Sequence, residues 1–337
     1  MKVWRYRPVW FATAVLTASV LMSPYLSVAQ DVPPETQSVR VQPESKVQFT
    51  GGISSWLLTQ GQTKWNHDFS QLTYKDDSTN IVELSGNATF LKRWFARGEF
   101  GYGAMGSGTL VDNDFSSANG PIESSTTSNI TGNNLWYVNG DVGARLIYFP
   151  NQRGGIGFFT GIQYWRQQYE ATGVVQTFCN PVTPLCNPAN TGQDLAPGQK
   201  AITNTSTWIS WRLGIEGDYR ITRRLSLEGR IVFSPVSSLS NDDIHHLRQT
   251  AGPTLPALQQ DPSFHMSGTG IGTNVDVGAS YLVTSRFSVN LGYRFWWNQV
   301  LNGSVTVYPV GAPAATVNLN EFQTYRYGVT LGLRYAF

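Results

Sequence analysis

The sequence predicts an all-β fold, a ten-stranded antiparallel transmembrane β-barrel of a bacterial outer membrane. Three observations support this prediction. The N-terminus has the layout of a secretory signal, apolar residues alternate with polar or small ones over ten long segments, and the connections between these segments are mostly short and long in turn. A barrel that is exported and then inserted into lipid has all three of these features.

The first residues predict export from the cytoplasm. Three basic residues precede an apolar run over residues 9–22, and the small residue Ala29 follows a few positions later. This is the layout of a cleavable signal peptide, so we assign residues 1–29 to the signal. A membrane anchor is the alternative, but the run is shorter than the roughly 20 residues that a transmembrane helix needs.

The mature chain is predicted to be one barrel behind a short lead-in. Residues 30–45 contain proline and are expected to form a flexible periplasmic segment, and residues 46–337 form the barrel. The formal charge of the whole chain is +2, and removal of the signal leaves it near −1. Because the chain has no basic tail or stripe, we expect no nucleic-acid partner.

The last predicted strand shows the alternation most clearly. Every second residue from Tyr325 to Phe337 is apolar or aromatic, and the residues between them are small, polar or cationic. Aromatic residues at both ends of an apolar face are typical of a lipid-facing strand. Ten segments follow this pattern: 47–60, 69–91, 94–112, 134–149, 155–173, 204–220, 225–245, 265–283, 286–303 and 322–337.

The connections predict the orientation of the barrel. Outer-membrane barrels have short periplasmic turns and longer external loops, and an even number of strands places both termini in the periplasm. The first hairpin, near residues 61–68, is shorter than the other external connections. The short turns lie near 91–93, 150–153, 222–224 and 284–285, and the long loops are 113–133, 174–203, 246–264 and 304–321.

The residues on the polar face of the strands are predicted to point into the lumen. Opposite charges that face one another across a narrow barrel form ion pairs. We therefore predict a filled interior, although the lumens of water-filled porins are charged as well. The charged members of this set are Arg97, Glu99, Asp141, Arg145, Glu216, Asp218, Glu228, Arg230, Asp276, Arg294, Arg326 and Arg334.

The only two cysteines of the chain, Cys179 and Cys186, lie in one loop segment that is rich in proline and asparagine. In an exported protein this arrangement predicts a local disulfide. A metal or redox site is the alternative, but no residue with metal-ligand spacing lies nearby.

Two acidic clusters are candidates for catalysis. Asp112 and Asp114 lie about twenty residues beyond one periplasmic turn, and Asp243 and His245 lie about twenty residues beyond another. Both strands run in the same direction, so both clusters stand about 45 Å above the turns, at the external rim. Carboxylates beside a histidine can activate water. The alternatives are a turn in which the aspartates bind their own backbone and a solvated Asp–His pair.

A metal site is a further alternative at the second cluster. His245, His246 and His265 could supply three ligands, but their spacing gives this reading little support. We therefore expect no metal and no cofactor.

Both clusters resemble those of the omptin family of outer-membrane aspartate/histidine proteases. Residues 106–115 are similar to the omptin segment that bears an Asp–Asp couple, and residues 234–245 align without a gap with the segment that bears a His–Asp dyad. Residues 70–72 and 331–337 also resemble the family. The resemblance covers about residues 50–337 and implies a divergent ten-stranded member with a protease groove at its rim.

The resemblance implies a role for each residue of the clusters. Asp112 and Asp114 would be the couple, which helps to position the nucleophilic water. Asp243 would orient His245, and His245 would take a proton from the water, with no covalent acyl-enzyme. His246 is the rival base if the register slips by one residue.

The chain departs from the family pattern at two sites. The two acidic residues at the bottom of the omptin substrate pocket are matched by Trp65 and Asn241, so the pocket has lost the charges that would bind Arg or Lys.

Omptins also need lipopolysaccharide, held by basic residues on the wall. Arg166 matches one of these and Thr207 replaces another. An interface-anchoring arginine is the alternative role of Arg166.

Strict alternation conflicts with an inward-facing site. Counting every second residue from the lipid-facing Phe233 places Asp243 and His245 on the outer face, and a similar count places Asp112 there too. We therefore predict a β-bulge in each of the two strands. Candidate positions are Gly106, Gly108 and Pro235.

Two functions remain open at this point. The first is a surface endopeptidase that hydrolyses extracellular peptides or proteins with activated water. The second is a non-enzymatic barrel of omptin ancestry, either a narrow pore or an adhesin, because a fold does not fix a function.

Overall fold

The computed structural model describes residues 47–337 except 118–119, 133 and 252–255. The predicted signal and lead-in, residues 1–29 and 30–45, lie outside the described residues. The described strands belong to one compact unit, Ser45–Phe337. Within the described part of the chain, no helix is long and apolar enough to cross a membrane.

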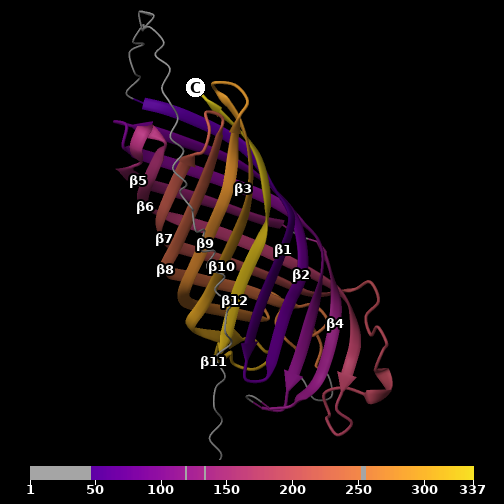
Figure 1. Ribbon diagram of the computed structural model, residues 1–337. Coiled ribbons are helices and arrows are strands. Elements are labelled where there is room, and N and C mark those ends of the chain that lie inside the picture. Colours follow the sequence, from indigo (N-terminus) through magenta and orange to yellow (C-terminus); the bar gives the residue numbers. More distant parts are fainter. Residues whose placement is uncertain (1–46, 118–119, 133, 252–255) are drawn as a thin grey trace, which may run out of the picture. The chain divides into compact units, whose positions relative to one another are not determined.

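The strands form a closed antiparallel ring with ten positions (Figure 1). Strand β10 pairs with both β9 and β12, which closes the sheet. Strands β4 and β5 share one position because both pair with β3 and β6, and β11 is a short addition to β10. The strands are β1 Val47–His67, β2 Ser70–Phe90, β3 Trp94–Phe115, β4 Ile122–Gly132, β5 Asn134–Tyr148, β6 Gly154–Cys179, β7 Lys200–Arg220, β8 Leu225–His245, β9 Phe264–Leu282, β10 Phe287–Val307, β11 Ala315–Asn318 and β12 Glu321–Ala336.

Each of the ten predicted segments matches a strand, and none runs past an end of its strand by more than one residue, but several strands extend further at the rim. The predicted loop at 61–68 is wrong, because β1 continues to His67 and a turn of Asp68 and Phe69 leads directly into β2. Much of the predicted loop 113–133 is also strand, since β4 begins at Ile122. These rim segments lie above the apolar band and carry polar residues on their outer face. The alternation on which the prediction depended is therefore weak there.

The outer wall changes character along each strand, as β8 illustrates. Ile231, Phe233 and Val236 are exposed on its lower part, whereas the exposed residues above them are Ser238 and Ser240. An apolar band of this kind faces lipid in an outer-membrane barrel, where it is about 25 Å tall. The lower parts of the strands are thus the membrane-spanning segments, and the rim stands above them.

A β-bulge reverses the alternation of β8. Relative to both neighbouring strands, β8 has one extra residue between Phe233 and Ser237. Phe233 and Val236 are therefore both outward, at 50% and 52% exposure, whereas Ser234 and Ser237 are buried. The bulge predicted at Pro235 is confirmed, and the inner face above it holds Asp243.

A second bulge reverses β3. Between Met105 and Ser107, β3 has one residue more than β2, so the extra residue is at Gly106, one of the two predicted positions in this strand. Above it Leu110 is buried, and Asp112 lies on the same inner face. The conflict between alternation and an inward site is resolved in both strands by one inserted residue.

The interior below the rim is filled. Arg230 Nη1 lies 2.7 Å from Glu99 Oε1, and Arg294 Nη1 lies 2.5 Å from Glu83 Oε2, so ion pairs cross the lumen. All twelve charged residues predicted to face the lumen form ion pairs. A layer of four fully or almost fully buried aromatic side chains packs with them: Trp56, Tyr137, Trp165 and Trp296.

Candidate active site at the rim of the barrel

Asp243 and His245 lie side by side on the inner face of β8. Nε2 of His245 is 2.9 Å from Oδ1 of Asp243. The other carboxylate oxygen, Oδ2, accepts hydrogen bonds from the Tyr74 hydroxyl at 3.2 Å and from Nδ2 of Asn204 at 2.7 Å. Asp243 is fully buried. Each of its oxygens therefore has a polar neighbour within hydrogen-bonding distance.

The position of His245 is fixed from its backbone as well as from its ring. Its backbone N–H donates to Ser263 Oγ at 3.0 Å, and its carbonyl accepts from Gln260 Nε2 at 3.0 Å. The imidazole packs against Phe264, with ring centroids 4.9 Å apart. The side chain keeps 12% of its surface exposed. The imidazole is thus held in place while part of it remains open to the rim.

Asp112 and Asp114 lie on the inner face of β3 above the bulge. They pair in register with Leu72 and Ser70 of β2, and Ser70 Oγ donates to Asp112 Oδ1 at 3.4 Å. Burial and the neighbouring Asp114 raise the pKa of Asp112 to about 7. Burial also raises the pKa of Asp114. The couple therefore retains a proton at a pH at which isolated aspartates have lost theirs.

The couple and the dyad act on each other electrostatically. His245 lowers the pKa of both Asp112 and Asp114, against the larger effect of burial. The charge of Asp243 in turn contributes to the raised pKa of Asp112. The structure thus brings all four residues of the predicted catalytic set together at the rim. Such a group can hold a water molecule, accept its proton and offer a second proton.

The floor beneath the dyad is neutral and closely packed. Trp65 of β1 and Asn241 of β8, the two predicted pocket residues, are both fully buried. The Trp65 indole packs on His67 and Phe264, with ring centroids 5.8 and 6.3 Å away. Nδ2 of Asn241 lies 3.4 Å from the sulfur of Met266. The positions predicted to have lost their acids are therefore occupied by an aromatic ring and an amide within an apolar layer.

Three further residues near the site were not predicted. Tyr74 and Asn204 hold Asp243, and they come from β2 and β7, far from it in the sequence. His67 is almost fully buried, and its Nδ1 accepts a hydrogen bond from the Phe69 backbone N–H at 3.3 Å. Burial chiefly lowers the pKa of His67, and His245 adds to this effect. Only Tyr74 had a nearby sequence signal, since it follows the family-like residues 70–72.

The other histidines of the rim have separate partners. Nε2 of His246 lies 2.9 Å from the Thr203 hydroxyl, and Nδ1 of His265 lies 2.7 Å from Asp242 Oδ1. Across the described residues, no cluster of three or more side chains is arranged to hold a metal ion. His245, His246 and His265 are thus not grouped as metal ligands.

Arg166 lies on the outer face of β6. Its register neighbours are Trp136 on β5 and Thr207 on β7, and its Nη1 donates to Asn134 Oδ1 at 3.4 Å. Trp136 stacks on Tyr164, with ring centroids 4.6 Å apart. An arginine beside outward-facing aromatic rings suits both roles considered above, namely a lipopolysaccharide contact and an interface anchor.

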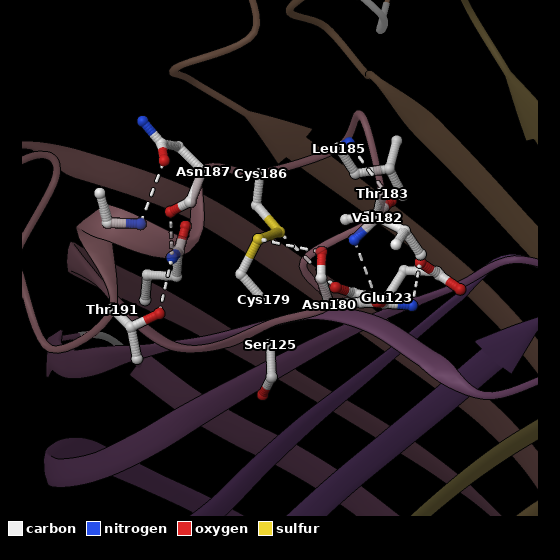
Figure 2. The surroundings of a disulfide bond; sticks show 12 residues. Glu123, Ser125, Cys179, Asn180, Val182, Thr183, Leu185, Cys186, Asn187 and Thr191 are labelled. Atoms are coloured by element: carbon white, nitrogen blue, oxygen red, sulfur yellow. Dashed lines mark hydrogen bonds between the residues drawn. A yellow bond between two sulfur atoms is a disulfide. The ribbon is translucent and has the colours of Figure 1, made fainter.

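A disulfide between Cys179 and Cys186 closes the loop that follows β6 (Figure 2). Nδ2 of Asn180 donates to Glu123 Oε2 at 3.0 Å, which ties this loop to β4. Nε2 of Gln176 donates to the carbonyl of Asn187 at 2.8 Å. The disulfide and these bonds fasten the long β6–β7 connection to the rim.

Comparisons with known proteins agree with this architecture. The family model described as the Omptin family matches residues 60–337. The outer membrane protease OmpT from Escherichia coli is similar in structure, with a TM-score of 0.68 and 19% identity over 86% of this chain and 97% of that chain. The translocator domain of the autotransporter NalP from Neisseria meningitidis has a TM-score of only 0.35, with 8% identity over 86% of this chain and 88% of that chain. No curated protein matches the sequence significantly. The likeness to OmpT supports the ten-stranded outer-membrane barrel.

Proposed function

The chain belongs to the omptin family, and from this premise we propose that this outer-membrane barrel is a surface endopeptidase. It would hydrolyse peptide bonds with water activated between the Asp112–Asp114 couple and the His245–Asp243 dyad. The observation that carries the proposal is the 2.9 Å contact of His245 with the fully buried Asp243, opposite a couple in which Asp112 has a pKa of about 7.

The proposed reaction gives each of the four side chains a role. Nε2 of His245 is engaged by Asp243, which leaves Nδ1 to accept a proton from water as the water oxygen attacks the scissile carbonyl. Asp243 stabilises the imidazolium that forms. The retained proton of the couple is a hydrogen-bond donor for the developing oxyanion. The imidazolium then gives its proton to the leaving amine, so no acyl-enzyme is formed.

The neutral floor sets the expected substrate class. A pocket for Arg or Lys needs carboxylates, and Trp65 and Asn241 supply none. The buried indole also fills space that a long side chain would need. We therefore propose that the enzyme cleaves extracellular peptides or proteins beside small, uncharged side chains, without the preference for basic residues that the family resemblance implies.

Lipopolysaccharide is the proposed lipid partner. The guanidinium of Arg166, beside the stacked rings of Trp136 and Tyr164 on the outer wall, can bind a phosphate group bidentately. No metal or other cofactor enters the proposed mechanism.

Cleavage of a peptide library by the purified barrel in lipopolysaccharide tests the proposal. We expect His245→Ala to lower kcat by about 10²–10⁴-fold, because it removes the general base. The matched control is His265→Ala, since His265 pairs with Asp242 rather than with the dyad. Turnover that is equal in wild type and His245→Ala would remove His245 from the mechanism.

The same assay tests the lipid partner. We expect activity to fall when lipopolysaccharide is omitted, and Arg166→Gln to need more of it for the same rate. If the activity of Arg166→Gln depends on the lipopolysaccharide concentration as that of wild type does, Arg166 is an interface anchor and not a lipopolysaccharide contact.

A further inference from the structure

The carboxylate of Asp243 is held in a way that the family resemblance did not predict. One oxygen faces His245, and the other accepts hydrogen bonds from Tyr74 and Asn204. We propose that Tyr74 and Asn204 are positioning residues that fix the carboxylate of Asp243 against His245. This inference rests on the proposed function of the same site.

The chemistry of the donors suits this role. Asp243 has no exposed surface, and among the described residues its ion-pair contact is with His245 and not with Arg or Lys. A buried carboxylate is costly unless hydrogen bonds compensate for the lost water. A hydroxyl and an amide stabilise the negative charge without neutralising it, so the charge remains available to the imidazolium.

The two donors come from different parts of the wall. Asn204 is the register partner of Asp243 on β7, so its position is set by backbone pairing. Tyr74 reaches Asp243 from β2. The Tyr74 ring is itself held, because it stacks on Tyr169 with ring centroids 4.7 Å apart. Rotation of the Asp243 carboxylate would therefore break hydrogen bonds to two separate strands.

Tyr169 supplies a matched control. Its hydroxyl bonds to Thr63 at 3.1 Å and to Asp77 at 3.3 Å, and not to the dyad. Tyr169→Phe therefore makes the same chemical change as Tyr74→Phe, on the adjacent ring of the same stack. A difference between the two variants isolates the hydroxyl that reaches Asp243.

Several titratable groups interact with Asp243. They are Tyr74 on β2, Asp112 on β3, His245 at the end of β8 and His246 just after it. Burial and Asp243 raise the pKa of Tyr74 well above its usual value, so the hydroxyl remains a donor throughout the working range. Removal of this donor leaves the carboxylate with the hydrogen bond from Asn204 alone, so the loss should appear in kcat.

The experiment compares wild type, Tyr74→Phe, Asn204→Leu and Tyr169→Phe on the best peptide from the library. We expect kcat to fall about 10–100-fold in the first two variants, the range for loss of a hydrogen bond to a charged group. KM should stay within about twofold. Tyr169→Phe should change neither kcat nor KM. A wild-type kcat in both Tyr74→Phe and Asn204→Leu would overturn the proposal.

A second measurement separates this proposal from the proposed function. In detergent micelles, ¹⁵N shifts of the His245 ring report its tautomer without any need for turnover. We expect one tautomer in wild type and Tyr169→Phe, and a mixture in Tyr74→Phe.

If wild type cleaves no peptide, the proposed function fails and the ring shifts alone decide the positioning role. Identical ring shifts in wild type and Tyr74→Phe would then overturn it. If Asn204→Leu does not fold, as judged by its heat-dependent gel migration, Tyr74→Phe alone decides the outcome.

Discussion

Asp112 illustrates how burial and one like-charged neighbour set the chemistry of a single side chain. An aspartate in water has lost its proton well below neutral pH, whereas the pKa of Asp112 is about 7 because of burial and Asp114. Below this pH the couple keeps the proton that the proposed mechanism uses, and above it Asp112 has lost that proton. We therefore expect the rate to fall as the pH rises through about 7.

Arg248 provides a test of this assignment. It lowers the pKa of Asp114, against the raising effect of burial. Arg248→Gln removes that cation, so the pKa of Asp114 should rise and the alkaline limb of the pH–rate profile should move to higher pH. Arg220→Gln, at the periplasmic end of β7, is the matched control. An alkaline limb that stays in place in Arg248→Gln would show that this limb does not report the couple.

The neutral floor of the pocket is predicted to determine which substrates are cleaved. Asn241→Asp, alone and with Trp65→Glu, supplies the acids whose absence defines the neutral floor. We expect kcat/KM for peptides with Arg or Lys before the cut to rise at least tenfold relative to kcat/KM for neutral peptides. That is the scale expected of a charge-assisted contact. Asp242→Asn, which changes the same kind of group on the outer face, should leave the ratio unchanged.

The two extra residues, at Gly106 and near Pro235, decide which way the candidate catalytic side chains point. Alternation predicted the strands, but only its conflict with the acidic clusters predicted the bulges. The rim segments could not be predicted from the pattern of a lipid-facing strand, because their outer residues are polar and the apolar outer face ends below them. The first hairpin illustrates this, since β1 continues to His67 where the sequence predicted a loop.

Deletion of Pro235 tests the role of the bulge. Without the extra residue, the part of β8 above it should reverse its faces and turn Asp243 and His245 outward. The readout is the labelling of Ser240→Cys by a membrane-impermeant maleimide, since Ser240 is exposed and both native cysteines are in the disulfide. We expect labelling and peptidase activity to fall several-fold on deletion. Deletion of the exposed loop residue Val182 should preserve both. Unchanged labelling after deletion of Pro235 would mean that the bulge does not set the facing of β8.

On the scale of the whole molecule, the closed ring holds an interior that is filled below the rim. Ion pairs cross the lumen between β8 and β3 and between β10 and β2, and the aromatic layer of Trp56, Tyr137, Trp165 and Trp296 packs with them. A continuous water channel would need these contacts to open. We therefore expect no steady single-channel conductance in planar bilayers, with a general porin as the positive control. A stable conductance would favour the pore alternative.

The sequence predicted the ring and the charged lumen, because each leaves a local pattern along a strand, and the family resemblance singled out the two candidate catalytic clusters. It did not predict the support of Asp243. Tyr74 is 169 residues and Asn204 is 39 residues from Asp243 in the chain, and neither stands in a motif that indicates this contact. Contacts of this kind depend on how the ring closes, and alternation along one strand contains no such information.

The short turn between β1 and β2 has a consequence for access to the site. Here Asp68 and Phe69 join the strands directly, beside the part of β2 that pairs with the aspartate couple. Between β6 and β7, by contrast, residues 180–199 stand on the rim. The β1–β2 connection therefore carries less chain beyond its strands than the β6–β7 connection does, so a folded substrate of the proposed peptidase would meet the shorter connection on this side of the couple.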